Sequence, residues 1–174
     1  MKGALTMREQ AELVQCAETL REMYDEFTQS VQDLGNKAKG RSTAGNKMGN
    51  SFLHWIGGSH IRTDRDRLCE EFLEKVQAQL ELIRTALEGV GAEETAEVWN
   101  AVADVMLEPI PGRSNATTDL MKRAMCSQFQ PMLAFLTPEQ LRGHYDRLKA
   151  AYRPRDLLPV EKELLREMER RLSL

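Results

Sequence analysis

The sequence predicts an all-α fold of about six helices that form a helical bundle. Over two long stretches, apolar residues recur at alternating spacings of three and four, which is typical of paired helices. Aromatic residues make up only 6% of the chain, whereas helix-favouring Leu, Ala, Glu, Arg, Met and Gln are abundant. No segment shows a convincing strand pattern. A chain of 174 residues can bury a substantial core, and we expect one domain spanning residues 1–174.

The first long helix is expected from Met7 to Leu34, within residues 1–34. Thr6 is suited to cap its start, and Gly35 is placed to end it. At about 1.5 Å per residue, such a helix is roughly 42 Å long and needs a partner along its length. Its expected seam consists of Leu13, Ala17, Leu20, Tyr24, Phe27, Val31 and Leu34.

The second long helix is expected over residues 64–90 and supplies that partner. Thr63 or Asp64 can cap its start, and Gly89 and Gly91 follow its end. Its seam matches the first in length, so the two helices are predicted to pack as an antiparallel pair. The expected seam positions are Cys69, Leu73, Val76, Leu80, Ile83, Leu87 and Val90.

Four shorter helices are expected over residues 92–174. The third helix should span Glu93 to Leu107, where Pro109 and Pro111 follow, and the fourth should begin near Thr118. Pro131 should kink or end the fourth helix. The fifth and sixth helices are expected from Pro138 to Tyr152 and from Pro159 to Leu172. Thr137 and Gln140 have the spacing of a capping box. The apolar positions of the fourth and sixth helices predict inward-facing Leu120, Met121, Ala124, Met125, Phe129, Val160, Leu164, Leu165, Met168 and Leu172.

The net charge of −3 conceals strong alternation along the chain. Residues 1–34 carry three basic and seven acidic residues, and residues 64–108 carry four basic and twelve acidic residues. Residues 35–63 carry five basic residues and no acidic residue, and residues 109–174 carry twelve basic and eight acidic residues. The segment 35–63 is also rich in glycine. We therefore expect a basic, glycine-rich crossover between the two long helices.

Part of this crossover resembles a phosphate-binding Walker A loop, but the match fails. In Gly40–Lys47 an extra Asn46 separates the second glycine from the lysine, and Met48 stands where a Mg²⁺-binding hydroxyl belongs. A long helix, rather than the required parallel strand, precedes the segment. The sequence therefore does not predict a nucleotide-binding loop.

Nucleic acid is the best single partner for the basic residues, because a flexible segment without carboxylates suits phosphate backbones. The predicted contacts in and after the crossover are Lys37, Lys39, Arg41, Lys47, Trp55 and Arg62, with Trp55 able to stack on bases. A second basic stripe on the sixth helix adds Arg166 and Arg170. Three alternatives stay open for the crossover: an acidic protein partner, the chain's own acidic residues 64–108, or a plain solvated connector.

The remaining patterns favour a binding protein over an enzyme. No metal site is expected, because His54, His60 and His144 lack helical ligand spacing and no Glu-x-x-His motif occurs. The paired carboxylates match solvated salt bridges, and no cofactor or catalytic residue is predicted. An alternative function is scaffolding, in which the heptad seams join a partner or a second copy in a homodimer; an enzyme with an unrecognised site is a third.

The expected setting is cytoplasmic, in a small bacterial protein. Cys16, Cys69 and Cys126 stand far apart and are odd in number, which is typical of reduced, buried thiols. Neither a signal-peptide core nor an apolar run approaching a membrane span is present, so no membrane partner is expected.

Overall fold

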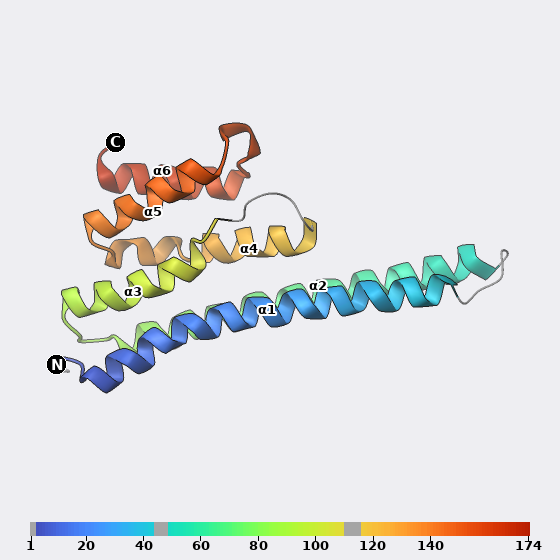
Figure 1. The fold of residues 1–174 in the computed structure, drawn as a ribbon, viewed down its shortest axis with the longest axis horizontal. Helices are drawn as coiled ribbons and strands as arrows, with labels where there is room; N and C mark the ends of the chain where they lie inside the picture. Colours follow the sequence, from blue (N-terminus) through green and yellow to red (C-terminus); the bar gives the residue numbers. More distant parts are fainter. Residues whose placement is uncertain (1–2, 44–48, 110–115) are drawn as a thin grey trace.

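The computed structural model confirms the all-α fold class. It describes the backbone of residues 3–43, 49–109 and 116–174, and the side chains of residues 3–37, 64–109 and 119–174. Within these residues six α-helices and two short 3₁₀ helices follow one another along the chain (Figure 1). They are α1 (Met7–Thr43), α2 (Gly49–Ala86), α3 (Ala92–Met106), α4 (Ala116–Gln128), η1 (Gln130–Phe135), α5 (Pro138–Ala151), η2 (Pro154–Asp156) and α6 (Pro159–Leu172).

Helices α1 and α2 form the predicted antiparallel hairpin, but both are longer than expected. The expected end at Leu34 and the expected start at Asp64 were wrong, because α1 continues to Thr43 and α2 already begins at Gly49. Most of the predicted crossover 35–63 is therefore helical backbone. A glycine inside a helix costs about 1 kcal/mol relative to alanine. At Gly35 that cost does not end α1, whose preceding turn is fixed by the buried Val31.

The seam between the two long helices contains most of the predicted positions. Leu20, Val76 and Ile83 are fully inaccessible to solvent. One buried position was not predicted: Phe72 packs its ring on Phe27 with 4.6 Å between the centroids, whereas the predicted Leu73 is only half-buried. At this point of α2, on the side of the far end of the hairpin, the buried residue is therefore one position before the predicted one.

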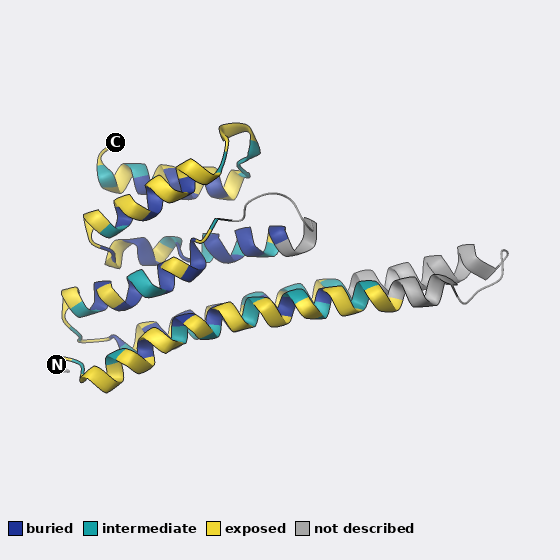
Figure 2. Cartoon of the chain, in the orientation of Figure 1, coloured by how far each residue is buried: buried dark blue, intermediate teal, exposed yellow. Residues whose placement is uncertain are grey.

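The shorter helices pack on one part of the hairpin, and α1 and α2 extend past them (Figure 1). Helix α3 lies against α1, α4 lies against α2 and α1, and α5 and α6 form the outer layer (Figure 1). Buried residues are concentrated where these layers meet (Figure 2), with Trp99, Met106 and Phe129 among the largest fully buried side chains. The hairpin thus contributes to the core with one part of its length and projects with the rest.

Local signals set the bounds of the shorter helices. Thr137 and Gln140 make the predicted capping box, and Thr6 and Glu9 make the same reciprocal pair of hydrogen bonds at the start of α1. Helix α4 ends before Pro131, as predicted, and the chain continues as η1.

The predicted inner faces of α4 and α6 were partly wrong. Leu120 and Val160, both expected inside, are 53% and 39% exposed. Charged side chains take the adjoining buried positions: Lys122 and Arg123 on α4 and Glu161 on α6. The apolar pattern could not identify these positions, because a charged residue is buried only when a specific partner offsets its lost hydration.

Candidate functional site

The residues predicted to contact nucleic acid fall in two separate parts of the fold. Lys37 is exposed on α1, close to the end of the hairpin where α1 finishes and α2 begins. Arg166 and Arg170 are exposed on α6, which packs on α4 and α5 away from that end of the hairpin (Figure 1). The fold does not bring the two groups together. The side chains of the other predicted residues lie outside the described ones: Lys39, Arg41, Lys47, Trp55 and Arg62.

The basic stripe on α6 is partly neutralised by the helix itself. Arg170 and Arg171 both bind the carboxylate of Glu167, at 2.6 Å and 2.8 Å between nitrogen and oxygen. The hydrogen bond from Arg170 is the main cause that lowers the pKa of Glu167 to about 2. Arg166 lies near Glu169 and contributes to a lowered pKa of that carboxyl, after the larger effects of Tyr145 and Lys149. These internal pairs reduce the charge that α6 offers to a partner.

The hairpin changes charge along its length. On α1 the last acidic residue is Asp33, which accepts a hydrogen bond from Gln29. On α2 the first acidic residue is Asp64, which lies 3.4 Å from the guanidinium of Arg67. Beyond these two aspartates the sequence contains basic residues and no carboxylate. The part that packs on the shorter helices is acidic, and the far part is basic.

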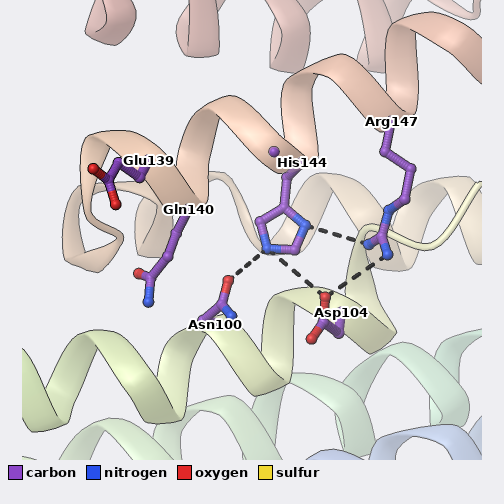
Figure 3. A pocket seen from close by; sticks show the side chains of 7 residues that line it. Asn100, Asp104, Glu139, Gln140, His144 and Arg147 are labelled. Atoms are coloured by element: carbon purple, nitrogen blue, oxygen red, sulfur yellow. Dashed lines mark hydrogen bonds and ion pairs between the residues drawn. The ribbon is translucent and has the colours of Figure 1, made fainter.

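A polar pocket of about 370 Å³ lies between α3 and α5 (Figure 3). His144 forms its buried floor, with Nε2 2.9 Å from Oδ1 of Asn100 and Nδ1 3.3 Å from Nη2 of Arg147. A guanidinium nitrogen only donates, so Nδ1 accepts and the Nε2 hydrogen is donated to Asn100. One neutral tautomer satisfies both contacts. The residues that line the pocket are Asn100, Asp104, Glu139, Gln140, Gly143, His144 and Arg147.

The surroundings of His144 favour its neutral form. Burial is the main cause that lowers the pKa of His144, and the nearby positive charge of Arg147 lowers it further. Asp104 acts in the opposite direction, with Oδ1 4.0 Å from Nε2 of His144. The same carboxylate lies 3.7 Å from Nη1 of Arg147, a loose ion pair between two half-exposed side chains. A histidine held in this way positions Arg147 and Asn100.

A buried lysine joins α4 to the end of α3. Lys122 donates from Nζ to the carbonyl oxygen of Val105 at 3.1 Å, and its ammonium lies 4.9 Å from the ring centroid of Tyr24. In a continuing helix Val105 would accept from the residue four positions on, but that residue is Pro109, which has no N–H. Lys122 supplies the missing donor. Burial lowers the pKa of Lys122, and Glu108 partly counteracts this.

A buried ion pair joins α4 to α6. Arg123 lies 2.9 Å from Oε2 of Glu161, and the same oxygen accepts the backbone N–H of Leu158 at 2.9 Å. Arg123 also donates to the carbonyl oxygen of Asp156 and lies over the ring of Tyr152. The two charges are almost fully shielded from water, so their pairing is a structural contact between helices.

Sequence reasoning missed the pocket and both buried cations. The pocket combines residues from two helices, and His144 and Asn100 are 44 positions apart, so no local motif marks it. Pro109 could have indicated that a side chain such as Lys122 donates to the end of α3, because the proline leaves a helix carbonyl without its usual donor. Nothing in the sequence pairs Arg123 with Glu161.

Comparison of the chain with family models, with curated proteins and with solved structures gives no match. Among residues 3–109 and 116–174, apart from the connection at 44–48, no helix is long and apolar enough to cross a membrane. Among the side chains that the structure describes, those of residues 3–37, 64–109 and 119–174, no three from His, Cys, Asp or Glu cluster in a way that could hold a metal ion.

Proposed function

We propose that this protein is a non-enzymatic nucleic-acid-binding protein that contacts phosphates through the far part of the α1–α2 hairpin. One observation carries the proposal. The hairpin extends beyond the shorter helices, and the helical residues of its far part are 35–43 of α1 and 49–63 of α2 (Figure 1). The sequence from 35 to 63 carries five basic residues and no acidic residue. A projecting basic element can reach a phosphate backbone while the acidic remainder of the protein stays away from it.

The dimensions of a helical hairpin favour contacts with the backbone over reading of bases. Each helix of about 37 residues is roughly 55 Å long and, with its side chains, about 10–12 Å wide. The major groove of B-DNA is about 12 Å wide and admits one helix. Two helices side by side are too wide for it. We therefore propose largely sequence-independent binding that depends on the release of counterions.

The salt dependence of binding tests this proposal. For five phosphate contacts, a plot of log K against log salt concentration should have a slope of about −4.5 on duplex DNA. Replacing three basic residues, in the variant Lys37→Gln/Lys39→Gln/Arg41→Gln, should reduce the slope to about −1.8. Fluorescence anisotropy of a labelled duplex, titrated between about 50 and 200 mM salt, measures both values.

A matched control removes the same charge from the acidic part of the protein. The variant Arg8→Gln/Arg67→Gln/Arg84→Gln changes three exposed residues, each of which already pairs with a carboxylate. It should leave the slope unchanged. An equal loss in both triple variants, or no binding at low salt, would overturn the proposal. Equally tight, salt-dependent binding of poly-glutamate would instead identify an acidic protein partner.

Two smaller variants test the other predicted contacts. Trp55→Leu should lower the affinity for single-stranded more than for double-stranded nucleic acid, because only unpaired bases are free to stack on an indole. Arg166→Gln/Arg170→Gln should change the slope less than the hairpin variant, because Arg170 is already paired with Glu167. A larger effect from α6 than from the hairpin would place the main contacts on α6.

The scaffolding alternative has less support. It relies on the heptad seams to join a second copy or a partner, but Leu20 and Leu80 are 0% and 2% exposed within a single chain. Their side chains are already covered by the other helices. A homodimer stays a prediction, and light scattering at several protein concentrations tests it.

A further inference from the structure

The pocket between α3 and α5 has the features of a second binding site, on a part of the fold separate from the far end of the hairpin (Figures 1 and 3). Its volume is about 370 Å³, and it is widely open to solvent. Its floor, His144, is 5% exposed and is fixed in one tautomer by Asn100 and Arg147. Asn100 and Arg147 therefore have a fixed partner before any ligand arrives.

Gly143 is an exposed residue of the pocket wall. It lies in the middle of α5, where glycine destabilises a helix relative to alanine. A Cβ atom at this position would meet no other atom within 4 Å, so packing of the fold does not require a glycine here. Gly143 does line the pocket, and a methyl group there would occupy space that the glycine leaves open.

The charges along the pocket are ordered. Glu139 and Arg147 lie on the same helix eight positions apart, which corresponds to about 12 Å along the axis. The amide side chains of Gln140 and Asn100 lie between them, and Glu139 and Arg147 mark opposite ends of the pocket (Figure 3). Within the described part of the chain, the Glu139 carboxylate makes no ion pair or hydrogen bond. One end is thus suited to a cation and the other can donate to an anion.

We propose that this pocket binds a short zwitterionic peptide, with the peptide's amino group on Glu139 and its carboxylate on Arg147. An extended tripeptide is about 10 Å long, which is of the same order as the axial rise of about 12 Å between Glu139 and Arg147. The side-chain NH2 groups of Gln140 and Asn100 can donate to its peptide carbonyls, because the two amide oxygens already accept from Thr137 and His144.

Arg147 can accept a carboxylate without leaving His144. Its guanidinium has five N–H groups in a planar fork, and the contacts in the structure involve Nη2 with His144 and Nη1 with Asp104. The Asp104 contact is 3.7 Å long and half-exposed, so a peptide carboxylate can compete with it. His144 keeps the guanidinium facing the pocket during that exchange.

Triglycine is the probe for the first experiment, added to ¹⁵N-labelled full-length protein and followed by NMR. Saturable shifts of the α5 amide signals, with a Kd of about 1 mM, are expected. N-acetyl-triglycine should bind about tenfold more weakly, and so should triglycine to the Glu139→Gln variant. Acetylation should have no further effect in that variant, because both changes remove the same contact. Independent, additive losses, or no saturable shift at about 10 mM triglycine, would overturn the proposal.

Gly143→Ala separates a ligand site from a purely structural glycine. The variant should raise the Tm by about 3 °C, as a better helix former, and should weaken triglycine binding about tenfold. The matched control, Ala150→Gly at an exposed position of the same helix, should lower the Tm and leave binding unchanged. A Gly143→Ala variant that is more stable and binds triglycine equally well would refute the role of this pocket.

Discussion

The α1–α2 hairpin and the four shorter helices use different interactions to hold their helices together. Along the hairpin, buried positions such as Leu20 and Ile83 are apolar and recur with the heptad period. In the shorter helices, α4 buries Lys122 and Arg123 beside apolar side chains, and α6 buries Glu161. The hairpin therefore depends on buried apolar area, whereas the packing of α4 depends on specific partners for charged groups.

Removing one member of the buried ion pair should have the largest effect on stability. Arg123→Met leaves Glu161 as an uncompensated charge that is only 6% exposed. We expect a loss of about 3–5 kcal/mol in the free energy of unfolding, measured by urea denaturation.

A double variant shows whether this loss comes from the unpaired charge. Arg123→Met/Glu161→Gln removes both charges, and the glutamine can still accept from the N–H of Leu158. The double variant should recover more than half of the lost stability. If the double variant is as unstable as Arg123→Met, the loss does not come from the unpaired charge of Glu161. The packing of α4 would then depend on buried apolar area, as the packing of the hairpin does.

A cavity in the hairpin seam should have the next largest effect. Leu20 is fully buried, so Leu20→Ala removes apolar contacts and leaves a void, which costs about 3 kcal/mol. The control is Val14→Ala on the same helix, where the valine is 39% exposed and the loss should stay below about 1 kcal/mol. Equal losses in the two variants would contradict the burial of the seam at Leu20.

The same contrast explains how much of the fold was predictable from the sequence. Regular apolar spacing identified the two long helices and their pairing, and the capping residue Thr137 identified the start of α5. The predicted end of α1 was wrong because Gly35 was taken to stop the helix, whereas a single glycine costs a helix only about 1 kcal/mol. The inner face of α4 was wrong because Lys122 and Arg123 are buried through partners that lie far away in sequence.

The candidate sites were predictable to unequal degrees for the same reason. The basic residues of the segment 35–63 form a local run, so composition alone was enough to single them out. The pocket forms only where α3 and α5 pack together. The sequence around Asn100 and the sequence around His144 do not indicate that these two residues are in contact. Gly143 is unusual in the sequence as a glycine inside a predicted helix. Only the structure shows that the space beside it is open.

The contact between Lys122 and the end of α3 should contribute less than the ion pair, because its acceptor is neutral. Lys122→Met keeps most of the apolar stem and removes the donor to the carbonyl of Val105, which has no helical donor because position 109 is proline. We expect a loss of about 1–3 kcal/mol in urea denaturation. Lys75→Met on the exposed part of α2 is the control and should be nearly neutral. If Lys122→Met left the free energy of unfolding unchanged, the carbonyl of Val105 would need no donor from α4.

The smallest expected effect is a pH dependence of stability that comes from His144. Burial and Arg147 lower its pKa in the folded protein, so below about pH 6.5 the unfolded chain binds more protons at this residue than the folded one. The groups facing the ring are Asn100 and Asp104 from α3 and Arg147 from α5, and only Asp104 favours protonation. Stability is therefore fully present above about pH 6.5 and falls as the pH decreases toward the pKa of the folded state.

Urea denaturation at a series of pH values measures this dependence, with a slope from His144 of at most about 1.4 kcal/mol per pH unit. His144→Gln retains a donor for Asn100 but cannot take up a proton, so it should remove that part of the slope. His54 and His60 are unchanged in this comparison, and their contribution cancels. Identical pH profiles for the two proteins would show that His144 titrates alike in the folded and unfolded states. In that case the junction of α3 and α5 would tolerate a buried charge without an ion-pair partner at 2.9 Å such as Arg123 has in Glu161.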